Sequence, residues 1–317
     1  MPADTRHVPV LLAETLTYLN VSRFRDQDGI FVDATFGGGG HSRAILEHTG
    51  RGTKVVAIDR DQAAVGRAVP LRERYGDRFT LLQGNFADLS QLLQEVQIKG
   101  IDALLLDLGL SSYQLSNAPR GFSFQLDGPL DMRMDQKQEI SAADIIRTAG
   151  VDQLRDIFKR FGEEPYAGSI ARAIVKARSV KPITTTRELA DLIVSLTPPD
   201  KIHRRLHPAT RVFQALRIAV NEELQALVAV LESGLEWLNR GGRLVVISYH
   251  SLEDRIVKRM FRQWSDPCIC PPGLPVCTCG KVPQVRRLTG KVVVPGADEV
   301  KRNPRSRSAR LRAVERL

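Results

Sequence analysis

Short apolar runs alternate with helix-length segments over the first third of the chain. The runs end near Asp33, Asp59, Leu82 and Asp107, and the segments between them have the lengths expected of crossovers in βαβ units. This pattern predicts a parallel sheet. After Asp107 the alternation stops, and the next buried strand is expected only at residues 243–248, R-L-V-V-I-S. Because one crossover helix cannot fill that gap, the pattern predicts an insertion.

Helical periodicity fills most of the gap. Apolar positions recur at helical spacing around residues 151–161, 170–178 and 186–196. We therefore predict an inserted helical subdomain at residues 117–206, which divides the sheet domain into residues 1–116 and 207–317.

The chain is expected to return to the sheet through one long helix. Residues 210–238 carry apolar side chains at three- and four-residue steps, which is the stripe of an amphipathic helix. The tail is rich in Pro, Gly and Arg, and its apolar positions predict a final strand near residues 309–314.

The first predicted strand breaks into four consecutive glycines in F-V-D-A-T-F-G-G-G-G-H, residues 31–41. Consecutive glycines persist where the chain turns tightly or where a ligand lies against the backbone. In open α/β sheets, ligands bind beyond the carboxyl ends of the strands, and an acid that closes the second strand typically binds ribose hydroxyls. Asp59 occupies that position, so the pattern predicts a nucleoside ligand.

The glycine loop favours S-adenosylmethionine over a dinucleotide. In G-x-G-x-x-G counted from Gly37, the sixth place is Ser42, preceded by the bulky His41, which disfavours a pyrophosphate site. Gly39 and Gly40 suit the close backbone approach of a methionine moiety. His41 either contacts the ligand or begins a helix facing solvent, and Phe86 either stacks on adenine or packs in the core.

Asp107 closes the fourth strand, where a reacting group is expected. Methyl transfer from a sulfonium depends mainly on positioning, and an amine acceptor needs an oxygen to accept its N–H bonds. Asp107 or a neighbouring carbonyl is the candidate. Methylation of a pyrimidine carbon would need a nucleophilic cysteine, and none follows these strands.

The segment S-Y-H-S-L-E-D, residues 248–254, follows the fifth predicted strand. Tyr249 and His250 are candidates for stacking on, or hydrogen bonding to, a flipped base. Ser248 or Ser251 with His250 and Asp254 would instead form a hydrolase triad, an interpretation disfavoured because no G-x-S-x-G elbow is present.

Charge separates the end of the chain from the rest. The formal net charge is +10, and residues 240–317 contain 17 Lys and Arg against 6 Asp and Glu. This asymmetry indicates a polyanion, most simply nucleic acid, with a solvated basic face as the alternative. The phosphate-binding candidates are Arg255, Lys258, Arg259, Arg305, Arg307, Arg310 and Arg312.

Composition indicates an ordinary soluble protein, with 43% hydrophobic and 26% charged residues. No apolar run is long enough to cross a membrane, and the first residues do not form a signal peptide, so a cytoplasmic location is expected.

Four cysteines fall in C-I-C-P-P-G-L-P-V-C-T-C, as Cys268, Cys270, Cys277 and Cys279. Either they bind a metal or they are reduced thiols; C-x-C is less typical of zinc than C-x-x-C.

Taken together, these motifs are similar to those of a known family. The chain resembles the MraW family, also called RsmH, of small-subunit ribosomal RNA methyltransferases over nearly its whole length. The resemblance rests on H-V-P-V-L-L from residue 7, T-F-G-G-G-G-H-S from 35, A-I-D-R-D from 57, D-L-G-L-S-S-Y-Q-L from 107, R-G-F-S-F-Q-L-D-G-P-L-D-M-R-M from 120, H-P-A-T-R-V-F-Q-A-L-R from 207, I-S-Y-H-S-L-E-D-R-I-V-K from 247 and N-P-R-S-R-S-A-R-L-R from 303.

The resemblance implies an α/β fold of the class I S-adenosylmethionine-dependent methyltransferases, with an inserted helical subdomain that recognises the substrate. It implies methylation of the exocyclic N4 amine of a decoding-centre cytidine in 16S rRNA of the small ribosomal subunit. The implied cofactor contacts are Gly39, Gly40, His41, Asp59, Phe86, Asp107 and Gln114. Asp107 lies in D-L-G-L rather than the N-P-P-Y of many amino methylases, so its catalytic role is inferred. Two other classes remain as alternatives: a nucleotide-dependent oxidoreductase, and a non-catalytic RNA-binding assembly factor.

Overall fold

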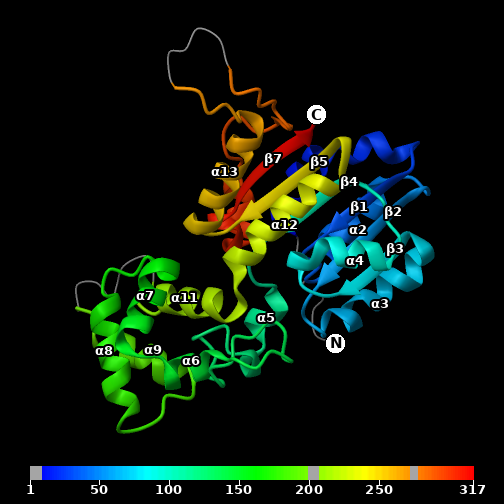
Figure 1. The fold of residues 1–317 in the computed structure, drawn as a ribbon. Helices are drawn as coiled ribbons and strands as arrows, with labels where there is room; N and C mark the ends of the chain where they lie inside the picture. Colours follow the sequence, from blue (N-terminus) through cyan, green and yellow to red (C-terminus); the bar gives the residue numbers. More distant parts are fainter. Residues whose placement is uncertain (1–8, 199–206, 272–277) are drawn as a thin grey trace. The chain divides into compact units, whose positions relative to one another are not determined.

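The structure is a computed structural model that describes residues 9–198, 207–271 and 278–317. It divides into two compact units, each with its own core (Figure 1). The first unit is built from Met1–Gly109 and Gln225–Leu317, and the second from Leu110–Leu224.

A seven-stranded sheet forms the centre of the first unit, in the order β3-β2-β1-β4-β5-β7-β6. Neighbouring strands from β3 to β5 are parallel, and β7 is antiparallel to both β5 and β6. The strands are β1 (Gly29–Asp33), β2 (Thr53–Asp59), β3 (Phe79–Gln83), β4 (Ile101–Asp107), β5 (Leu238–Ser248), β6 (Val285–Arg287) and β7 (Arg310–Arg316). The predicted strand ends at Asp33, Asp59 and Asp107 are confirmed.

Helices cover both faces of this sheet. They are α1 (Leu12–Tyr18), α2 (Gly40–His48), α3 (Ala64–Tyr75), α4 (Leu89–Glu95), α12 (Glu223–Trp237), α13 (Ser251–Ser265) and α14 (Ala297–Arg302), with 3₁₀ turns η1 (Val21–Arg25), η2 (Gly76–Arg78), η3 (Phe86–Asp88) and η5 (Pro304–Ser308). Successive strand residues point to opposite faces, so Phe31 joins the core that includes residues of α2 and α3, whereas Val32 joins the core under α4, α12 and α13. Burial on both faces explains why the strands are nearly continuous apolar runs.

The second unit is helical. It contains α5 (Ser112–Ser116), η4 (Ala118–Arg120), α6 (Ala142–Thr148), α7 (Val151–Gly162), α8 (Ala167–Arg178), α9 (Thr186–Ser195) and α11 (Thr210–Asn221). The helices predicted at 151–161, 170–178 and 186–196 are confirmed as α7, α8 and α9. Capping boxes begin α6 at Ser141 and α9 at Thr185, which satisfies backbone N–H groups that have no partner within the helix.

The single long helix predicted at residues 210–238 is wrong. The chain forms α11 and α12 with a break at Glu222, whose φ of 51° and ψ of 35° are left-handed. Asn221 stabilises the break, because its side chain donates to the carbonyl of Met132 at 2.7 Å and accepts from the N–H of Met134 at 2.8 Å. Arg217 also pairs with Glu223 at 2.8 Å. The apolar positions that predicted one helix are therefore divided between two cores: those of α11 pack in the helical unit and those of α12 pack against the sheet.

The limits of the helical unit differ from those expected for the insertion. The sequence placed them at 117 and 206, whereas the compact unit runs from Leu110 to Leu224. The difference arises because α11 packs against α7 and contributes Phe213 and Leu216 to the helical core. In the described parts of the chain, no helix combines the length and apolar character needed to cross a membrane.

Candidate functional site

Three carboxylates close adjacent strands at one edge of the sheet. β1 lies between β2 and β4, so their final residues Asp33, Asp59 and Asp107 are neighbours. The strand order also reverses between β1 and β4, and a crevice beyond such a reversal is where open α/β sheets bind ligands. The connection across this reversal is fixed locally, because the N–H of Asp107 donates to Thr35 Oγ1 at 2.6 Å.

The glycine segment makes the turn that leads from β1 into α2. Gly37 and Gly39 have φ of 54° and 75°, a left-handed conformation that favours glycine. A Cβ atom on Gly39 would lie 2.7 Å from the ring of Phe36, and one on Gly40 would lie 2.4 Å from the side chain of Pro9. A side chain at either position would clash with Phe36 or Pro9, so packing within the protein requires glycine at both.

The Asp59 carboxylate is held by backbone donors beside this turn. Its Oδ2 accepts from the N–H of Gly37 and its Oδ1 from the N–H of Asp61, each at 2.9 Å, and Arg67 Nη2 lies 3.9 Å from Oδ2. Burial raises the pKa of Asp59 to about 6, against the opposing effect of these donors. A carboxylate oxygen has more than one acceptor site, so Asp59 can also accept hydroxyl hydrogens.

Asp107 lies between a histidine and a tyrosine. Its Oδ1 accepts the hydroxyl hydrogen of Tyr249 at 2.8 Å, and its Oδ2 lies 3.4 Å from His41 Nε2. Burial raises the pKa of Tyr249 well above 10, and the nearby Asp107 charge adds to this effect, so the phenol keeps its proton and continues to donate. Tyr249 thereby fixes the orientation of the carboxylate.

His41 is buried in the first turn of α2, with its side chain 6% exposed. Burial opposes a charge on the ring, but the contacts with Asp107 and the charge of Asp33 outweigh burial and raise the pKa of His41. Its Nδ1 has no hydrogen-bond partner among the described residues. A buried imidazole nitrogen without a protein partner is available to a bound ligand or to a water molecule.

Asp33 and Thr35 were not identified as site residues from the sequence. Asp33 is 1% exposed, accepts from Ser42 Oγ at 2.6 Å, and has a pKa raised by burial. It supports the first turn of α2 next to His41. Its position as the last residue of a strand, the same as that of Asp59 and Asp107, was a signal that could have found it.

The remaining cofactor candidates lie in different surroundings. Phe86 begins η3 and is partly buried against the core formed with α4 and α12. Gln114 belongs to the helical unit, where it is 6% exposed and forms the capping box of α5 with Ser111. The structure thus brings the glycine turn, His41, Asp59 and Asp107 together in the first unit.

The residues after β5 do not form a hydrolase triad. His250 is the N-cap of α13: its Nδ1 accepts from the N–H of Glu253, and its Nε2 lies 3.1 Å from Glu253 Oε1. Asp254 instead pairs with Arg312 at 2.7 Å and Arg310 at 3.1 Å. Burial would raise the pKa of Asp254, but these two guanidinium groups lower it below its usual value.

The tail arginines divide into two pairs. Arg310 and Arg312 lie on β7 and tie it to α13 through Asp254, so they act in the fold. Arg305 and Arg307 lie in η5 and are exposed. Arg255, Lys258 and Arg259 are exposed on α13.

Comparison with known proteins identifies the family. The profile of the MraW methylase family matches residues 4–317. The chain belongs to this family. It is 54% identical over 316 residues to ribosomal RNA small subunit methyltransferase H of Thermomicrobium roseum, covering 100% of this chain and 95% of that protein. It is 50% identical over 314 residues to the enzyme of the same name from Trichlorobacter lovleyi, covering 99% of each.

Membership of the MraW family agrees with the sheet topology. The order β3-β2-β1-β4-β5-β7-β6, with β7 antiparallel, is that of class I S-adenosylmethionine-dependent methyltransferases. The α/β fold class predicted from the sequence is thus confirmed.

Proposed function

We propose that this MraW-family protein transfers a methyl group from S-adenosylmethionine to the exocyclic N4 amine of a decoding-centre cytidine in 16S rRNA of the small ribosomal subunit. The observation that carries the proposal is Asp59, which closes β2 beside the bare glycine turn in a chain that matches the family over residues 4–317. Two full-length relatives at 54% and 50% identity bear the name of a small-subunit rRNA methyltransferase.

The residues at the carboxyl edge fit such a donor. S-adenosylmethionine would supply an electrophilic methyl group. The Asp59 carboxylate accepts the two ribose hydroxyls, which matches its buried position and remaining lone pairs. Gly39 and Gly40 let the backbone approach the methionine moiety, and the buried Nδ1 of His41 supplies a polar contact.

Phe86 is a further proposed donor contact within the first unit. Phe86 offers a ring face at the end of β3 for the adenine. Gln114, in the motif that begins at Asp107, stays a donor contact predicted from the family resemblance.

Asp107 is the proposed catalytic residue. The lone pair of a cytosine amine is delocalised into the ring, and an acceptor for its N–H bonds makes the lone pair available. Asp107 provides a carboxylate that Tyr249 holds at 2.8 Å, so its orientation is set before the base arrives. The new N–C bond forms as the C–S bond breaks, and the amine releases a proton afterwards. Catalysis therefore depends on placing the amine in line with the methyl group.

RNA recognition is assigned to both units. We infer that the helical unit recognises the substrate, and that Arg305 and Arg307 contact phosphates, because they are exposed in η5 at the strongly basic end of the chain. Tyr249 and His250 were candidates for contacting the base. Their contacts with Asp107 and Glu253 favour positioning roles within the protein. A ribosomal substrate places the protein in the cytoplasm.

The proposal is tested by methyl transfer. Small subunits from cells lacking this protein are incubated with labelled S-adenosylmethionine, and the nucleosides are analysed by mass spectrometry. We expect N4-methylcytidine with the wild-type protein and a loss of about tenfold or more with Asp107→Asn. Asp88→Asn, which changes an acid in η3 outside the proposed contacts, is the matched control.

Two other outcomes would identify the alternative functions. RNA binding without methyl transfer on correctly assembled subunits would indicate an assembly factor. Thermal stabilisation by NAD, with none by S-adenosylhomocysteine, would indicate an oxidoreductase.

A further inference from the structure

Three thiols converge in the first unit, in the segment that connects α13 to β6. Cys268 and Cys270 follow the end of α13, and Cys279 precedes β6. Their Sγ atoms all lie within 4.8 Å of one another, and those of Cys268 and Cys279 are 4.0 Å apart. The proposed methyl transfer uses none of them.

We propose that Cys268, Cys270 and Cys279 bind a zinc ion. Zinc binds thiolates at about 2.3 Å with tetrahedral geometry, which places neighbouring sulfur atoms about 3.8 Å apart. The 4.0 Å separation of Cys268 and Cys279 is close to that value. A disulfide joins only two sulfurs, at about 2.0 Å, and would leave the convergence of the third unexplained. Cys277, the fourth cysteine of the motif, lies outside the described residues.

The backbone around the thiols suits a metal thiolate. The N–H of Thr278 donates to Cys270 Sγ at 3.4 Å, a contact of the kind that orients metal ligands. Gly280, directly after Cys279, has φ of 66°, a left-handed conformation that favours glycine. Sulfur ligands in a tetrahedral arrangement select zinc over harder cations such as magnesium and calcium.

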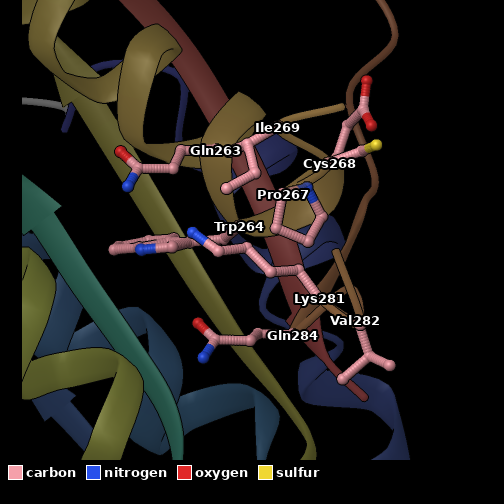
Figure 2. Close-up of a pocket in the computed structure, with 10 residues that line it drawn as sticks. Gln263, Trp264, Pro267, Cys268, Ile269, Lys281, Val282 and Gln284 are labelled. Carbon is pink, nitrogen blue, oxygen red and sulfur yellow. The ribbon is translucent and has the colours of Figure 1, made fainter. Parts of the chain in front are cut away.

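Apolar side chains in the described part of this segment are exposed, which gives a metal a structural role. Ile269 is 69% exposed and Val282 is 72% exposed. Both line an open pocket of about 590 Å³, together with Trp264, Pro267 and Cys268. Figure 2 draws these lining side chains. One backbone hydrogen bond, from Gln284 N–H to the Trp264 carbonyl at 2.8 Å, joins the base of the segment. Since hydrophobic packing is weak here, metal binding would supply the energy that orders the segment.

The test measures zinc in the purified full-length protein. Protein from cells grown with added zinc is expected to contain about one zinc per chain by plasma mass spectrometry. Cys268→Ser, Cys270→Ser and Cys279→Ser should each lower that content several-fold. Val282→Ala, a change in the same segment away from the thiols, should leave it unchanged and serves as the matched control.

Two measurements on the wild-type protein keep the test independent of whether the variants fold. Titration with a mercurial reagent should release zinc in step with thiol modification. Cobalt in place of zinc should give the intense near-ultraviolet absorption of sulfur-to-cobalt charge transfer. Zinc-free protein from zinc-rich cells, zinc retained by all three variants, or a Cys268–Cys279 disulfide in protein prepared without oxidant would overturn the proposal.

Discussion

Donor binding should weaken at acid pH because of Asp59. The proposed ribose contact needs the ionised carboxylate, and burial raises the pKa of this group to about 6 in the free protein. Hydroxyl hydrogens donated by the ribose stabilise the ionised form, so the donor lowers this pKa when it binds. Affinity is therefore half its maximum near pH 6, approaches its full value towards pH 8, and falls as the pH drops below 6.

The size of the effect follows from the pKa. If only the ionised form binds, affinity at pH 5 is about tenfold lower than at pH 8, which corresponds to about 1.4 kcal/mol. The Asp59 side chain is 12% exposed, so solvent screens the charge only weakly.

The raised pKa of Asp59 also affects the stability of the fold. Donor affinity rises with pH, whereas this contribution to stability falls with pH. Because the folded-state pKa of about 6 lies above the ordinary value of 3.8, ionised Asp59 destabilises the fold at neutral pH by about 3 kcal/mol. That cost is relieved as the pH falls from 6 towards 3.8. Asp59→Ala removes the cost but also loses two accepted hydrogen bonds, each contributing about 1 kcal/mol. The variant should thus lose donor binding while its Tm stays within a few degrees.

The assay is calorimetric titration with S-adenosylhomocysteine between pH 5 and pH 8, in buffers of different ionisation enthalpy. We expect proton release on binding near pH 6, and the same fall in affinity at acid pH in His41→Gln, which removes the imidazole next to Asp107. A flat profile would refute the role of Asp59, as would wild-type affinity in Asp59→Ala. If the affinity of His41→Gln no longer fell at acid pH, the titrating group would be the His41 imidazole.

Three further changes test the remaining parts of the site. Gly39→Ala should weaken donor binding at least tenfold, because a φ of 75° strains any other residue by about 1–2 kcal/mol and the added Cβ would meet the Phe36 ring at 2.7 Å. The control is Gly66→Ala, whose added Cβ meets nothing within 4 Å. Equal donor affinities of the two variants would contradict the steric argument. Tyr249→Phe should lower kcat about tenfold with little change in the donor KM, because the Asp107 carboxylate loses the hydrogen bond that orients it. An unchanged kcat in steady-state kinetics would show that Tyr249 does not position Asp107. Arg305→Gln with Arg307→Gln should weaken RNA binding and flatten the plot of log affinity against log salt by about 1.4 for two single-strand contacts; an unchanged slope would assign both arginines to folding.

The sheet could be predicted because its pattern is local. β1, β2 and β4 are apolar runs that end in an acid, and burial on both faces makes such runs continuous. β6 has three residues, too few to show a period. The break at Glu222 depends on contacts of Asn221 with residues almost ninety positions away, which periodicity does not record.

The residues of the site also divide into those that the sequence predicted and those whose roles only the folded structure shows. Asp59 and Asp107 were predicted because strand ends meet at one edge of a parallel sheet. The capping role of His250 depends on helix geometry, and the engagement of Arg312 by Asp254 spans 58 residues of sequence. A charge count treats every tail arginine alike, and only the folded chain shows that Arg310 and Arg312 pair with Asp254.

The most direct measurement is a crystal structure with S-adenosylhomocysteine bound. We predict both ribose hydroxyls within hydrogen-bond distance of the Asp59 carboxylate, with the homocysteine moiety along the backbone of Gly39 and Gly40. A ligand bound elsewhere, or an Asp59 carboxylate that keeps its contacts with Gly37, Asp61 and Arg67 and makes none with the ligand, would contradict the account.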